Sequence, residues 1–105
     1  MDLVIIDYGS GNLRSVENAF ENTVKTNKLK FKIKVTNKLD LISKADHLVL
    51  PGVGSFPDCK KGLEDIDGLI NLLTNEVINK RKKFLGICVG MQLMVDYSLT
   101  LCCTC

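Results

Sequence analysis

The chain has 105 residues, a net charge of +2, an apolar share of 46% and a charged share of 25%. This length allows one small domain, and the composition is that of an ordinary globular protein. The small charge and the scattered lysines argue against a nucleic-acid partner. No run of about 18 apolar residues predicts a membrane span. Because the acidic start also lacks the basic region of a secretory signal, we expect a cytoplasmic protein.

The cysteine pattern argues against both disulfides and a metal site. There are five cysteines, an odd number, and Cys102, Cys103 and Cys105 lie in the last four residues. A disulfide framework needs paired cysteines, and a structural zinc site needs four ligands at workable spacing. The end of the chain supplies neither arrangement, so we expect no bound metal and no cofactor.

Apolar patterns predict strands that alternate with helices. Continuous or alternating apolar runs predict strands at residues 2–7, 31–35, 46–50 and 83–87. Helical spacing of apolar residues predicts helices at 13–24, 37–44, 56–64, 67–80 and 89–97. The run at 31–35 alternates with period two, which indicates a half-exposed strand at the edge of a sheet.

This order of elements predicts an α/β fold, a doubly wound and mostly parallel sheet with helices on both faces. Ligands of such sheets bind at the carboxyl ends of the strands. Glycine-rich loops follow three of the predicted strands, at residues 7–12, 51–55 and 86–90. We therefore expect the functional site at this edge of the sheet.

Cys88 is the candidate nucleophile. It is the central residue of Gly-Ile-Cys-Val-Gly at 86–90, where a predicted strand gives way to a predicted helix. Such a turn bends the backbone sharply and projects its central side chain above the sheet edge. The helix N-terminus favours the thiolate, which attacks carbonyl carbons. The alternative is a buried, inert cysteine in a glycine-rich turn, because five residues alone are a weak signal.

Three separate motifs resemble one known family. They are Ile-Ile-Asp-Tyr-Gly-Ser-Gly-Asn-Leu at 5–13, Leu-Pro-Gly-Val-Gly-Ser-Phe at 50–56 and Leu-Gly-Ile-Cys-Val-Gly-Met-Gln at 85–92. In this order they are similar to the glutaminase subunits of imidazole glycerol phosphate synthases, a branch of the class I glutamine amidotransferases. The resemblance extends from about residue 2 to about residue 96.

The last residues do not continue the pattern. Residues 97–105 have no clear helical periodicity and end without a further strand. We therefore expect residues 1–96 to be the N-terminal part of a glutamine amidotransferase domain. The tail at 97–105 is expected to be truncated or out of frame.

The resemblance implies that Cys88 attacks the side-chain amide of glutamine and forms a thioester while ammonia leaves. Negative charge develops on the carbonyl oxygen in that step, and fixed backbone N–H groups stabilise it. The implied donors are the amide of Val89 and one amide from the loop of Gly52, Val53 and Gly54. The alternative for this loop is an ordinary end of a strand.

Gln92 lies one helical turn beyond the nucleophile and is implied to help hold the substrate glutamine. The alternative is a solvated glutamine on a helix surface. The nucleophile also needs a histidine base oriented by a carboxylate, and the resemblance implies that both lie beyond residue 105. The single histidine, His47, begins the strand predicted at 46–50, at the end opposite Cys88, so we expect a surface histidine. The chain alone is therefore expected to have negligible glutaminase activity.

The same resemblance implies a cyclase partner with a (β/α)₈ barrel. The cyclase is either a separate subunit of a heterodimer or a fused domain, and it uses the ammonia to make imidazole glycerol phosphate in histidine biosynthesis. Two alternatives stay open: another class I amidotransferase with a different ammonia acceptor, and a non-catalytic flavodoxin-like module that holds a phosphate or flavin. Against the module, the glycine loops lack G-x-G-x-x-G and Walker A spacing.

Overall fold

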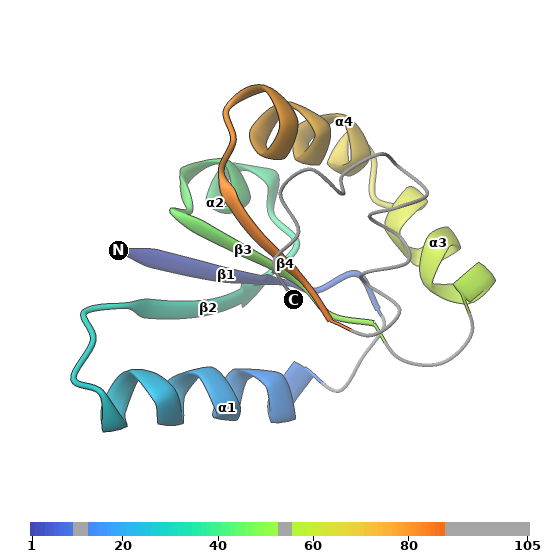
Figure 1. The fold of residues 1–105 in the computed structure, drawn as a ribbon. Helices are drawn as coiled ribbons and strands as arrows, with labels where there is room; N and C mark the ends of the chain where they lie inside the picture. Colours follow the sequence, from blue (N-terminus) through green and yellow to red (C-terminus); the bar gives the residue numbers. More distant parts are fainter. Residues whose placement is uncertain (10–12, 53–55, 88–105) are drawn as a thin grey trace.

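A computed structural model of the chain describes residues 1–9, 13–52 and 56–87. Within this part, four strands form one sheet in which every neighbouring pair is parallel (Figure 1). Their order is β2 (Lys32–Thr36), β1 (Asp2–Ile6), β3 (His47–Leu50) and β4 (Lys83–Gly86). The prediction of a parallel α/β sheet is confirmed, and so is the prediction that the strand near residues 31–35 lies at an edge.

Helices cover both faces of this sheet (Figure 1). One face carries α1 (Leu13–Thr26), and the other carries α2 (Leu39–Lys44), α3 (Phe56–Glu64) and α4 (Leu69–Leu73). The doubly wound arrangement is therefore confirmed. The helix predicted at 89–97 and the tail at 97–105 lie outside the described residues. Among the helices that the structure describes, none is long and apolar enough to cross a bilayer.

The central strands are apolar throughout because both of their faces are buried. In β1, Leu3 and Ile5 pack on the side of α1, whereas Val4 and Ile6 pack on the side of α2, α3 and α4. Strand β3 follows the same rule, with Val49 on the first side and its neighbours on the second. The alternation of strand side chains thus explains why the two continuous apolar runs lie in the middle of the sheet.

The helix predicted as one element at 67–80 is divided, so that prediction was wrong in its detail. The α-helix α4 ends at Leu73, and a π-helix, η1 (Thr74–Asn79), follows it directly. The amide of Lys80 donates to the carbonyl of Asn75, five residues earlier, at 3.0 Å. The wider turns of a π-helix change which residues face inward. Here Glu76 and Val77, which are adjacent in sequence, are both fully buried.

The buried carboxylate of Glu76 meets lysines at the amino end of the sheet. Lys82 Nζ lies 3.5 Å from Glu76 Oε1, and Lys80 Nζ lies 3.3 Å from Glu76 Oε2. Lys82 Nζ also donates to the carbonyl of Ser43 at the end of α2, at 2.7 Å. A buried charge needs such partners. Lys82 therefore joins α2, η1 and the start of β4.

Candidate active site

The described parts of three loops meet at the carboxyl edge of the sheet. They are residues 7–9 after β1, residues 51–52 after β3, and residue 87 after β4. The Tyr8 hydroxyl donates a hydrogen bond to the carbonyl of Pro51. The amide of Ile87 donates to the carbonyl of Leu50 at 3.0 Å. The first bond joins two of these loops, and the second extends the pairing of β4 with β3 to the start of the third loop.

Tyr8 is the residue of this edge whose importance the sequence analysis missed. Val4, Ile6 and Tyr8 alternate with period two, so Tyr8 continues the buried side of β1 beyond the end of the strand. The side chain is only 4% exposed, and a buried tyrosine hydroxyl needs a hydrogen-bond partner. The alternation was the available signal for burial. The partner, the carbonyl of Pro51, lies 43 residues away in sequence and has no local signal.

Helix α3 packs directly against the backbone of Tyr8. A Cβ atom built on Gly62 would lie 2.7 Å from the Tyr8 carbonyl oxygen, closer than real Cβ contacts. Glycine is therefore required at this point of the helix, although it weakens an ordinary helix interior. The close approach fixes the backbone of Tyr8 against α3.

The first loop turns immediately after β1. The amide of Asp7 donates to the carbonyl of Thr36 at 3.0 Å, which extends the pairing of β1 with β2. The Asp7 carboxylate accepts a hydrogen bond from the amide of Gly9 at 3.3 Å, and Gly9 has a φ of 86°. Aspartate often bonds the amide two residues ahead in turns, and glycine adopts positive φ without strain. These contacts fix where Tyr8 leaves the strand.

The third loop, which leads to Cys88, starts beside the end of β3. Because Ile87 pairs with Leu50, the residue before Cys88 lies beside the residue before Pro51. Gly52 is buried in the loop that follows β3 and is the one predicted site residue among the described residues. The other predicted site residues lie outside them, so their roles remain predictions: Cys88, Val53, Gly54, Val89 and Gln92.

His47 lies at the other end of the sheet. It begins β3, as predicted, and its side chain is half-buried. Its ring packs edge-on against Phe31, with ring centroids 5.1 Å apart and an interplanar angle of 78°. The Nδ1 atom is buried without a hydrogen-bond partner among the described residues. The packing on Phe31 accounts for the burial of His47.

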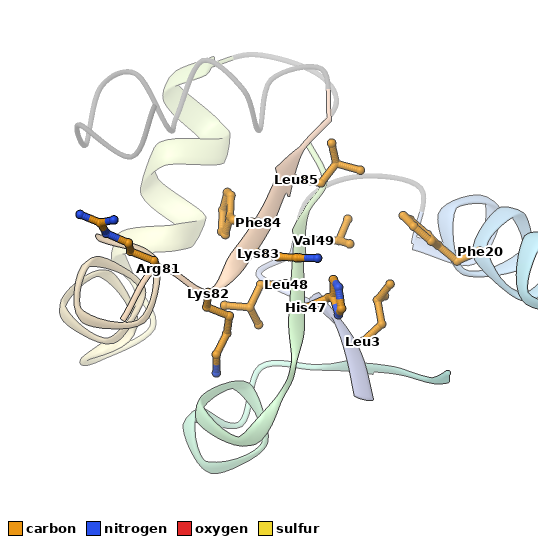
Figure 2. A pocket seen from close by; sticks show the side chains of 10 residues that line it. All are labelled: Leu3, Phe20, His47, Leu48, Val49, Arg81, Lys82, Lys83, Phe84 and Leu85. Atoms are coloured by element: carbon orange, nitrogen blue, oxygen red, sulfur yellow. The ribbon is translucent and has the colours of Figure 1, made fainter. Parts of the chain in front are cut away.

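A pocket of about 530 Å³ opens beside His47 and extends along β3 and β4 (Figure 2). In Figure 2 the side chains of Leu3, Val49 and Leu85 lie on the side of the sheet that faces Phe20 of α1. The lining contains no residue of the three loops at the carboxyl edge. Leu48 and Phe84 line the pocket from the other face of the sheet, so the pocket follows both faces along β4 and lies away from the three loops.

Comparisons with known proteins agree with the motifs. Residues 4–99 match the family described as glutamine amidotransferase class-I. The chain is also similar to three proteins named imidazole glycerol phosphate synthase subunit HisH. It is 50% identical to that of Rhodopseudomonas palustris over 94 residues, 46% to that of Brucella suis biovar 1 over 99, and 45% to that of Rhodospirillum rubrum over 96.

These alignments cover 90%, 94% and 91% of this chain, but 44%, 46% and 45% of the respective relatives. The chain therefore spans less than half the length of the curated relatives described above. The matched part of this chain includes all three glycine-rich loops of the carboxyl edge.

Proposed function

Since the chain belongs to the class I glutamine amidotransferase family, we propose that it is part of a glutaminase that supplies ammonia to a cyclase partner. The observation that carries the proposal is that three loops begin at one edge of the sheet, where Tyr8 of the first loop bonds Pro51 of the second and Ile87, at the start of the third, bonds the last residue of β3. The name of these relatives supports the proposal that the ammonia is used to make imidazole glycerol phosphate in histidine biosynthesis.

In the proposed reaction, the Cys88 thiolate attacks the side-chain amide carbon of glutamine and forms a carbon–sulfur bond. The electron pair of the carbonyl moves to oxygen, and the resulting oxyanion accepts hydrogen bonds from backbone amides. When the oxyanion collapses, the carbon–nitrogen bond breaks, the nitrogen takes up the proton that the catalytic base removed from the Cys88 thiol, and ammonia departs. Water then hydrolyses the thioester, which gives glutamate and returns the thiol.

The proposed oxyanion donors are the amide of Val89 and one amide from Gly52, Val53 and Gly54. Losing one such donor typically costs about 3 kcal/mol of transition-state stabilisation. The buried position of Gly52, two residues after Leu50 at the end of β3, supports including it among these candidates. In this proposal Gln92 helps to hold the substrate glutamine.

The proposed reaction also needs a base that is not His47, because His47 begins β3 at the amino end of the sheet. We propose that a histidine and its orienting carboxylate come from outside this 105-residue sequence. The partner is then a cyclase subunit or a fused cyclase domain, and the complex works in the cytoplasm without nucleic acid or membrane. The chain alone is expected to release negligible ammonia from glutamine, and measurable Cys88-dependent release contradicts this expectation.

A diazoketone analogue of glutamine tests the proposal directly. The purified chain is incubated with the analogue, digested, and mapped by mass spectrometry. Modification confined to Cys88 among the five cysteines supports a glutaminase site. Absence of modification together with a flavin that copurifies contradicts it and supports a flavodoxin-like binding module. Equal modification of several cysteines also contradicts it, since that pattern reflects general thiol reactivity.

A further inference from the structure

We draw no further inference here: the strongest candidate, the mostly apolar groove of about 530 Å³ that follows both faces of the sheet along β4, carries nothing because nothing among the described residues shows what covers it.

Discussion

At the amino end of the sheet the described contacts use charge, whereas at the carboxyl end the loops are joined by neutral hydrogen bonds. Lys82 connects the buried carboxylate of Glu76 to the last turn of α2 at the amino end. At the carboxyl end, a tyrosine hydroxyl and a backbone amide donate to backbone carbonyls, those of Pro51 and Leu50. Among the described residues, the two ends are therefore fixed by different interactions.

We infer that the charged contacts at the amino end mainly affect stability, whereas the hydrogen bonds at the carboxyl end mainly affect reactivity. An ion pair with a buried partner strongly affects the free energy of unfolding, because breaking it leaves a charge without compensation. A neutral hydrogen bond contributes about 1 kcal/mol, yet it fixes the direction of a peptide group. Removing a partner of the buried charge at the amino end should therefore lower stability, and removing a neutral hydrogen bond or the thiol at the carboxyl end should mainly alter reactivity.

Cys88→Ser should remove the reactivity of the carboxyl end. We expect at least about a hundredfold less incorporation of the glutamine diazoketone, because a serine hydroxyl is a far weaker nucleophile than a thiolate. Cys103→Ser, which removes a thiol from the tail, should incorporate the reagent as the wild type does. Incorporation that survives Cys88→Ser but is lost in Cys103→Ser would place the reactive thiol in the tail and contradict the site.

Lys82→Met should produce the largest loss of stability. Among the described residues it leaves the buried Glu76 carboxylate with only the largely exposed Lys80 as an ion-pair partner, at 3.3 Å, so we expect the free energy of unfolding to fall by about 3 kcal/mol. Urea denaturation followed by circular dichroism measures this change. The adjacent Lys83→Met removes an exposed lysine and should change stability by about 0.5 kcal/mol or less.

The double variant Lys82→Met/Glu76→Gln tests whether the charge of Glu76 causes this loss of stability. Because the unpaired charge causes most of the loss, replacing Glu76 by a neutral amide should recover part of the stability that Lys82→Met removes. If Lys82→Met costs no more than Lys83→Met, the charged contacts do not stabilise the amino end as described.

Gly62→Ala should lower the stability of the protein, although replacing glycine by alanine inside a helix usually raises it. In an ordinary helix interior it stabilises by up to about 1 kcal/mol. Here the new Cβ would lie 2.7 Å from the Tyr8 carbonyl oxygen, so we expect a loss of about 1–3 kcal/mol. Lys61→Ala, at the exposed neighbouring position of α3, is the control in thermal unfolding. A Gly62→Ala variant more stable than the wild type would contradict the close packing of α3 on Tyr8.

Lys34→Ala should have the smallest effect. Lys34 Nζ lies 3.6 Å from Asp2 Oδ2, and both side chains are partly exposed to solvent, at 42% and 34%. Exposed ion pairs contribute little, so we expect a change of less than about 0.5 kcal/mol that shrinks further at high salt. Thermal unfolding at low and high salt measures it. A salt-insensitive loss above about 1 kcal/mol would show that charge matters at the amino end even without burial.

The sequence was sufficient to predict most of the fold because apolar periodicity reflects burial. The strands near 2–7 and 46–50 are continuous apolar runs since β1 and β3 are covered on both faces. Helix α3 matches its predicted bounds at residues 56–64. The division of the helix at Leu73 had no such signal, because the burial of Glu76 depends on a lysine that follows it and on the end of α2.

The sequence was sufficient to predict where the candidate site lies, but not which residues contact one another there. Glycine-rich loops after successive parallel strands indicate the carboxyl edge from sequence alone. The contact between Tyr8 and Pro51 depends on how two loops from different strands lie side by side, and on the close approach that Gly62 permits. Such contacts between distant segments leave no local pattern. They are the part of the site that required three-dimensional coordinates.

The most direct measurement of the central claim is protection of Cys88 by substrate. The chain is alkylated with iodoacetamide at increasing concentrations of L-glutamine, with D-glutamine as the control, and the rate at Cys88 is followed by mass spectrometry. A glutamine site at the carboxyl edge predicts saturable slowing by the L-isomer and little by the D-isomer. Equal rates with both isomers at every concentration would contradict the account.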